Sequence, residues 1–239
     1  MNRVAEALCA GFINKTCAVV VMPYKLSPSS LNLMEECERC FWLQLNSRIL
    51  RPSGIFPSLP SGVDNVLKTH FDSFRDKGKL PPELKGVDAQ LFSNIQLLDV
   101  WRNNMKGIQF KDGSGNVIKG AVDDVLQKGS SLIVLDFKTR GFPVKEDTAT
   151  HYQLQLDVYN FLLRKIGYET EDYAYLLFYM PKEVSRSGEF IFNSELVKMP
   201  TSIKNAERAI SKALTLLDGK LPPLNPECKY CKWGRVEKG

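Results

Sequence analysis

Two C-x-x-C pairs near opposite ends of the chain restrict how it can fold more than any other feature of the sequence. The first pair is Cys37 and Cys40, and the second is Cys228 and Cys231. In a reducing compartment such pairs indicate metal ligation rather than disulfides. Four thiolates suit either one structural Zn²⁺ ion or one [4Fe–4S] cluster. A shared site would join the first long helix to the C-terminus, whereas the alternative is that the pairs lie apart as buried, reduced cysteines.

The N-terminal residues do not have the pattern of a secretory signal. Asn14 and Lys15 interrupt the apolar residues of this segment, so it lacks the roughly 7–15 apolar residues of a signal peptide. We interpret residues 1–24 as a leader or an extended translation start. No run in the sequence approaches the ~18–20 apolar residues of a membrane helix. We therefore expect a cytoplasmic protein with no membrane contact.

The composition excludes several classes of protein. With 44% hydrophobic and 25% charged residues, the chain is globular and not disordered, collagen-like or a coiled coil. Its net charge of +5 permits a nucleic-acid partner but does not demonstrate one. The histidines are His70 and His151 alone, so a three-histidine metal site is excluded. No G-x-x-x-x-G-K-[ST] loop occurs, which excludes a helicase motor in this chain.

The apolar periodicity predicts helices interspersed with strands. Helices are predicted over 27–45, 63–77, 152–166 and 202–217. Strands are predicted over 108–110, 117–126, 132–137, 173–180 and 189–197. Turn residues separate the first three strands, which should form an antiparallel meander, and a loop is predicted over 51–62. We expect one α/β (α+β) domain over 25–239, with a mixed central sheet flanked by helices.

Charged residues stand at the ends of two strands of this meander. Gly120-x-x-Asp123-Asp124 comes late in one strand, and Asp136-x-Lys138 ends the next. Residues two apart on a strand share a face, so Asp136 and Lys138 point the same way. Asp123 or Asp124 can approach Asp136 from the neighbouring strand. Asp123 is the better candidate, because Asp124 should face the other side.

Such a group of residues is typical of a metal site. Neighbouring carboxylates repel each other, and a divalent cation that prefers oxygen ligands, such as Mg²⁺, relieves the repulsion. A lysine beside it can orient or help to deprotonate a water, or stabilise charge on a phosphate. The alternative is an Asp–Lys ion pair at the surface end of a strand. The run 132–135 is apolar on both faces, as in a buried strand, and this favours a functional site.

In order and spacing these motifs resemble the PD-(D/E)XK nuclease superfamily, in its RecB-like exonuclease branch. That branch typically shows G-x-x-D on one strand, D/E-x-K on the next, and Q-x-x-x-Y on the following helix. Here the motifs read Gly120-x-x-Asp123, Asp136-x-Lys138 and Gln155-x-x-x-Tyr159. The resemblance spans roughly residues 25–235 and implies a restriction-endonuclease-like core.

The resemblance also implies roles for the strand residues. Asp123 and Asp136 would ligate Mg²⁺ or Mn²⁺, helped by the backbone carbonyl of Phe137. Lys138 would position the nucleophilic water. Arg140 lies directly after this strand and would contact the nucleic acid, as would Lys145, which lies a few residues further along the chain.

Helical residues would complete the site. Gln155 and Tyr159 lie four apart on one helix face and would support the site or hold the DNA backbone. Many relatives carry a histidine at G-x-x-x-H in an N-terminal helix. Here Gly62 is followed four residues later by Val66, so His70 is the candidate ligand. Its alternative place is the solvated or core side of its helix.

The resemblance suggests an iron–sulfur cluster at the cysteines. Related iron–sulfur nucleases, including CRISPR-associated and helicase-linked enzymes, use one N-terminal and three C-terminal cysteines. This chain keeps four cysteines but divides them two and two. Because the number of cysteines is kept, we expect a [4Fe–4S] cluster, with Zn²⁺ as the alternative.

These observations predict a metal-dependent DNA nuclease, an exonuclease acting on single strands or duplex ends. Protein partners would come from a repair, recombination or CRISPR complex. A rival hypothesis is a catalytically inactive nucleic-acid-binding or complex-building subunit stapled by zinc. A third is an unrelated zinc-stabilised α/β protein that binds no nucleic acid.

Overall fold

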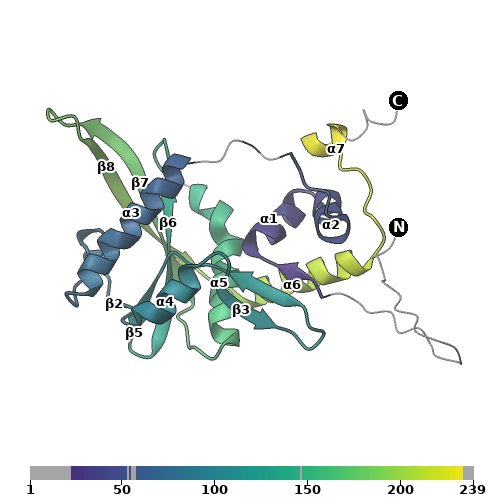
Figure 1. The fold of residues 1–239 in the computed structure, drawn as a ribbon, viewed down its shortest axis with the longest axis horizontal. Helices are drawn as coiled ribbons and strands as arrows, with labels where there is room; N and C mark the ends of the chain where they lie inside the picture. Colours follow the sequence, from purple (N-terminus) through teal and green to yellow (C-terminus); the bar gives the residue numbers. More distant parts are fainter. Residues whose placement is uncertain (1–22, 53, 55–57, 146, 234–239) are drawn as a thin grey trace, which may run out of the picture.

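A computed structural model describes residues 23–52, 54, 58–145 and 147–233 (Figure 1). Most of the predicted leader, residues 1–22, lies outside these ranges. Tyr24 belongs to the folded part, because its hydroxyl donates a hydrogen bond to the carbonyl of Leu217 at 2.9 Å. Within the described ranges, no helix combines the length and apolar character needed to cross a membrane.

The strands form two sheets. The smaller sheet has the order β1-β4-β3, with β1 at Lys25–Leu26, β4 at Val117–Gly120 and β3 at Ile108–Lys111. The larger has the order β2-β5-β6-β7-β8, with bounds Gln90–Leu91, Asp124–Lys128, Ser131–Thr139, Tyr173–Val184 and Phe190–Pro200. The pairs β1–β4 and β6–β7 are parallel, and the others are antiparallel. The predicted mixed α/β fold is confirmed.

Helices lie around both sheets (Figure 1). The α-helices are α1 (Pro28–Glu36), α2 (Glu38–Ser47), α3 (Ser58–Arg75), α4 (Ile95–Arg102), α5 (Gln153–Lys165), α6 (Ile203–Asp218) and α7 (Lys229–Trp233). Two 3₁₀ turns, η1 (Pro82–Leu84) and η2 (Thr148–Tyr152), connect them to the strands. The N-terminal helices α1 and α2 lie beside the C-terminal α7 at one end of the molecule, and the β7–β8 hairpin projects at the other (Figure 1).

Strand β6 divides the core according to its period of two. Leu132 and Val134 belong to the larger apolar cluster, which also contains buried residues of α1, α5 and α6. Ile133 and Leu135 alternate with them and pack in the second cluster, which lies under α3. Both faces of β6 are therefore covered, as its apolar run predicts.

The predicted strand over 117–126 is two strands in different sheets. Gly120 ends β4 opposite Ile108, whereas Asp124 begins β5 opposite Leu135. Between them, Arg102 donates from Nε to the backbone carbonyl of Asp123 at 2.8 Å. The chain thus leaves one sheet and enters the other at this point, while the antiparallel pairings β3–β4 and β5–β6 follow the prediction.

Two helix boundaries also differ from the predictions. The helix predicted over 27–45 is interrupted at Cys37, whose extended backbone (φ −164°, ψ 104°) separates α1 from α2. Helix α3 begins at Ser58, so part of the predicted loop over 51–62 is helical. Pro60 fits there because the first N–H groups of a helix have no acceptor within it, so a missing donor costs little.

Candidate active site and metal centre

Asp123 and Asp136 lie side by side where β5 and β6 pair. Asp124 is opposite Leu135 in this antiparallel register. Asp123 Oδ2 accepts a hydrogen bond from the backbone N–H of Phe137 at 2.8 Å. Burial, together with the charge of Asp136, raises the pKa of Asp123 to about 7. Burial also raises the pKa of Asp136, although Lys138 opposes the rise.

Lys138 links the acids to helix α5. Its ammonium forms an ion pair with Asp136 on the shared face of β6. It also donates to Gln155 Oε1 at 3.1 Å, and Gln155 Nε2 donates to the Tyr159 hydroxyl at 2.8 Å. Burial lowers the pKa of Lys138, but the charges of Asp136 and Asp123 outweigh burial and raise it. The structure thus joins two of the predicted motifs in one chain of contacts.

Gly120 and Tyr159 are in close contact, which couples the first motif to the third. A Cβ atom at Gly120 would lie 2.7 Å from a ring carbon of Tyr159 and 3.0 Å from a methyl carbon of Leu162. Tyr159 is itself buried. Only glycine leaves room at position 120 for the tyrosine ring, so the glycine of G-x-x-D makes space for the tyrosine of Q-x-x-x-Y.

Helix α3 contributes two residues that the sequence motifs do not include. Lys68 Nζ lies 2.6 Å from Asp64 Oδ2 and 3.4 Å from Asp123 Oδ1. The charge of Asp64 acts to raise the pKa of Asp123 and of Asp136. The available signal was the i,i+4 spacing of Asp64 and Lys68. This spacing is not specific for a functional site, because solvated helix faces commonly carry such pairs.

The structure does not bring His70 to the carboxylates. His70 Nε2 lies 3.1 Å from Glu83 Oε1, and this oxygen also accepts from the Tyr179 hydroxyl at 2.9 Å. The ring packs edge-on against Phe74 of its own helix. Among these residues of α3, it is Asp64 and not His70 whose charge acts on the two acids.

The side chains at this site suit a divalent cation. Three carboxylates, from Asp64, Asp123 and Asp136, gather around two ammonium groups, from Lys68 and Lys138. The buried Oδ2 atom of Asp136 lies in the ion pair with Lys138 but has no hydrogen-bond partner among the described residues. Carboxylate oxygens are the ligands that Mg²⁺ prefers. A cation would relieve the repulsion that raises the pKa values of the acids.

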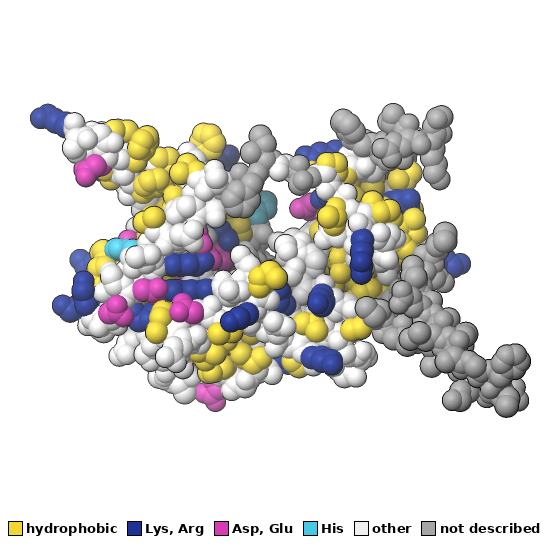
Figure 2. Space-filling view, viewed as in Figure 1, with side chains coloured by type: hydrophobic (Ala, Val, Ile, Leu, Met, Phe, Trp, Pro, Cys, Tyr) yellow, Lys and Arg dark blue, Asp and Glu magenta, His cyan; other side chains and the backbone are white. Residues whose placement is uncertain are grey.

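The segment after β6 carries the predicted nucleic-acid contacts. Arg140 donates its backbone N–H to the Tyr179 carbonyl at 2.9 Å, and its buried Nε has no hydrogen-bond partner among the described residues. Lys145 is exposed, and Phe142 between them is 77% exposed. Lys and Arg side chains are spread over the visible face rather than gathered in one patch (Figure 2). The contacts of Arg140 and Lys145 with nucleic acid remain a prediction.

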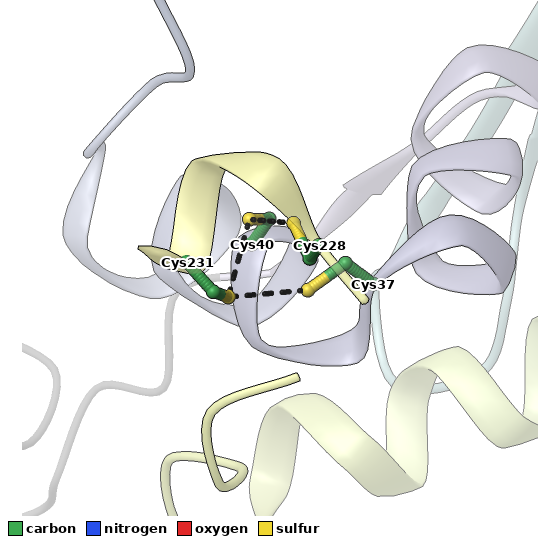
Figure 3. Close-up of side chains that lie close together, drawn as sticks. All are labelled: Cys37, Cys40, Cys228 and Cys231. Atoms are coloured by element: carbon green, nitrogen blue, oxygen red, sulfur yellow. Dashed lines mark hydrogen bonds between the residues drawn. The ribbon is translucent and has the colours of Figure 1, made fainter. Parts of the chain in front are cut away.

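The four cysteines form one buried cluster (Figure 3). Cys37 lies between α1 and α2, Cys40 lies in α2, Cys228 directly precedes α7, and Cys231 lies in α7. The Sγ atoms of Cys37 and Cys231 are 3.5 Å apart, those of Cys40 and Cys228 3.7 Å, and those of Cys40 and Cys231 4.0 Å. All four Sγ atoms lie within 4.8 Å of one another, so the structure brings the two pairs together.

The pKa values of two thiols in the cluster are shifted in opposite directions. Burial raises the pKa of Cys40 to about 12. Burial also acts to raise the pKa of Cys228, but the backbone N–H of Cys231 and neighbouring thiols lower it to about 6. Arg51 lies against the cluster, with Nη2 donating to Cys228 Sγ at 3.7 Å. A bound metal ion would stabilise all four sulfurs as thiolates.

Among comparisons with known proteins, a match to a family model agrees with the motifs. A family model for the PD-(D/E)XK nuclease superfamily matches residues 86–236. Fifteen chains of solved structures match. One, titled "Crystal structure of SSO0001", is 18% identical, with a TM-score of 0.38 over 92% of this chain and 88% of that chain. No curated protein matches in sequence.

Proposed function

This chain belongs to the PD-(D/E)XK nuclease superfamily, and we propose that it is a divalent-metal-dependent DNA nuclease. The observation that carries the proposal is the contact set of Asp123, Asp136 and Lys138 where two neighbouring strands pair. The reaction would add water across a P–O bond of the DNA backbone. The enzyme would act as an exonuclease, and its substrates would be single strands or duplex ends.

The acids would hold the metal. Asp123, Asp136 and the backbone carbonyl of Phe137 would ligate Mg²⁺ or Mn²⁺, with Asp64 as a further carboxylate that the structure adds. The cation would supply Lewis-acid stabilisation of charge on the phosphate. Lys68 would serve as a counter-charge for Asp64 and Asp123.

Lys138 would orient the water or donate to a phosphate oxygen. Its pKa is raised by Asp136 and Asp123, so it is a protonated donor at neutral pH. Gln155 accepts a hydrogen bond from the Lys138 ammonium and donates one to the Tyr159 hydroxyl. These two bonds restrict the direction in which the ammonium points. Precise placement of a donor is worth more to catalysis than its charge alone.

The segment 140–145 would contact the substrate. Arg140 and Lys145 would contact phosphates, and the exposed ring of Phe142 can stack on a base. The proposal includes a cytoplasmic location and partner proteins in a repair, recombination or CRISPR complex.

A cleavage assay with labelled single-stranded and duplex DNA tests the proposal. We expect cleavage with Mg²⁺ or Mn²⁺ and none with EDTA. Asp136→Asn and Lys138→Ala should each reduce the rate by about 10²- to 10⁴-fold. The matched controls are Asp99→Asn and Lys182→Ala, whose side chains are 66% and 50% exposed and lie outside the site.

Two results would contradict the proposal. One is cleavage that persists in both Asp136→Ala and Lys138→Ala. The other is DNA binding by the folded protein without turnover in any divalent metal. That second result would identify the non-catalytic binding or complex-building subunit instead.

A further inference from the structure

The distances between the cysteine sulfurs match those around a single ion. Four ligands at about 2.3 Å from one tetrahedral Zn²⁺ define a tetrahedron with edges of ~3.8 Å. The measured separations are 3.5 Å for Cys37–Cys231, 3.7 Å for Cys40–Cys228 and 4.0 Å for Cys40–Cys231. No pair exceeds 4.8 Å. Three of the six separations are therefore close to the edge of a tetrahedron around one zinc ion, and the other three are at most 4.8 Å.

The same distances do not fit the [4Fe–4S] cluster that the family resemblance suggested. In that cluster each cysteine binds a different iron, and a core of four irons and four sulfides lies between the thiolates. Sulfur atoms separated by 3.5 to 4.0 Å are in van der Waals contact with each other. They leave no room for such a core, and to admit it the two helical segments that carry the cysteines would have to move apart.

We propose that Cys37, Cys40, Cys228 and Cys231 bind one Zn²⁺ ion in a closed structural site. All four ligands come from the protein, so no position remains for water or substrate, as in structural rather than catalytic zinc sites. The zinc links the α1–α2 segment to α7. These two segments lie beside each other in Figure 3. Zinc binding by these cysteines does not depend on nuclease activity at the carboxylates.

Arg51 has the contacts of a residue that stabilises the thiolates. One zinc ion and four thiolates carry a net charge of about −2. Arg51 donates to Cys228 Sγ at 3.7 Å, lies with its guanidinium 4.5 Å from the ring centre of Tyr230, and forms an ion pair with Glu36. This cation next to the sulfurs offsets part of the charge and covers the Cys228 thiolate.

Metal analysis of the full-length protein tests the proposal. The protein is purified with and without oxygen from cells supplied with iron and zinc, and is washed with Mg²⁺ to clear the carboxylate site. We expect about one zinc per chain, negligible iron and sulfide, and a colourless solution from both preparations. Replacement of zinc by Co²⁺ should give the strong visible absorption of tetrahedral cobalt thiolate. A brown anaerobic preparation with about four irons and four sulfides per chain, or a folded protein without metal, would overturn it.

Cysteine variants assign the metal to these four residues. Cys228→Ser and Cys231→Ser should lose most of the bound zinc and lower the melting temperature. The two remaining cysteines, Cys9 and Cys17, lie outside the C-x-x-C pairs. Their variants Cys9→Ser and Cys17→Ser are matched controls and should keep the zinc. If the cluster variants fail to fold, Arg51→Gln provides a second measurement, because it should release zinc to a chelator several-fold faster than the wild type. Full zinc retention by both cluster variants would refute the assignment.

Discussion

Asp123 and Asp124 are adjacent and chemically identical, yet their surroundings give them opposite tasks. Asp123 faces Asp136 and Lys68 in the candidate active site. Asp124 is fully buried and accepts hydrogen bonds from Arg75 at 2.7 Å and from Arg102 at 2.8 Å. The alternation of a strand sends the two carboxylates to opposite faces. One face holds the candidate active site, and the other holds an ion-pair network that anchors the turn between the sheets.

The same Asp→Asn substitution is therefore expected to affect stability at one position and cleavage at the other. Asp124→Asn should destabilise the protein by about 3–5 kcal/mol, because it leaves buried arginines without a counter-charge. Asp123→Asn should abolish cleavage without lowering the stability, since it removes repulsion from Asp136. Urea unfolding and the nuclease assay measure the two effects. Equal losses of stability in both variants would contradict the assignment.

The contact between Gly120 and Tyr159 predicts the effect of a single methyl group. Gly120→Ala should cost about 1–3 kcal/mol and slow cleavage, because the displaced ring no longer supports Gln155. Gly113→Ala is the matched control, since a Cβ atom there meets nothing within 4 Å. Denaturant unfolding and the cleavage rate report the two effects. An unchanged rate in Gly120→Ala would show that the position of Tyr159 does not matter.

At the scale of elements, helix α3 shapes both the core and the site. Leu67 and Phe71 are buried against the β6 face that carries Leu135 and Phe137. The packing of these apolar residues sets the rotation of the helix. The same rotation brings Asp64 and Lys68 toward Asp123. The hydrophobic stripe thus determines which polar residues reach the acids.

Asp64 is therefore predicted to affect metal affinity. Asp64→Asn should raise the Mg²⁺ concentration for half-maximal cleavage by about tenfold, since it removes a carboxylate from the site. The cleavage rate at saturating Mg²⁺ should fall less. Asp76→Asn, exposed just beyond the end of the same helix, is the control. An unchanged Mg²⁺ requirement would exclude Asp64 from the metal site.

At the scale of the whole molecule, the carboxylates and the cysteines would form two metal sites with separate tasks. The carboxylate site lies where β5 and β6 meet and is reached by α3 and α5. The cysteine cluster lies where the N-terminal helices meet α7. The cysteine site joins segments nearly 200 residues apart, since Cys37 and Cys231 are separated by 194 positions. Closing so long a loop restricts the unfolded chain strongly.

Removal of the two metals should therefore have different consequences. A chelator that removes the cysteine-bound metal should lower the melting temperature by several degrees or more, because metal that binds only the folded state stabilises it. Restoring Mg²⁺ alone should recover cleavage in EDTA-washed protein but not the lost thermal stability. Calorimetry and the cleavage assay on the same samples separate the effects. Equal recovery of both by Mg²⁺ would mean that the two sites are not independent.

The amino-acid sequence alone predicts the features that depend on neighbouring residues. The period of two placed Asp136 and Lys138 on one face of β6, and the i,i+4 spacing of Gln155 and Tyr159 allowed their hydrogen bond. The motif order predicted the superfamily, and apolar periodicity predicted the mixed α/β fold. These are short-range patterns, and the backbone geometry of a strand or a helix is enough to interpret them.

The three-dimensional fold sets the features that depend on distant segments. It divided the strand over 117–126 between two sheets, placed Asp64 and Lys68 rather than His70 beside Asp123, and brought the cysteine sulfurs within 4.8 Å of one another. Local sequence carries no distances between residues that meet through packing. The rotation of α3 and the approach of α7 to α2 result from burying apolar faces across the whole chain. Two C-x-x-C pairs can suggest a shared cluster, but only folding sets the distances between the four sulfur atoms.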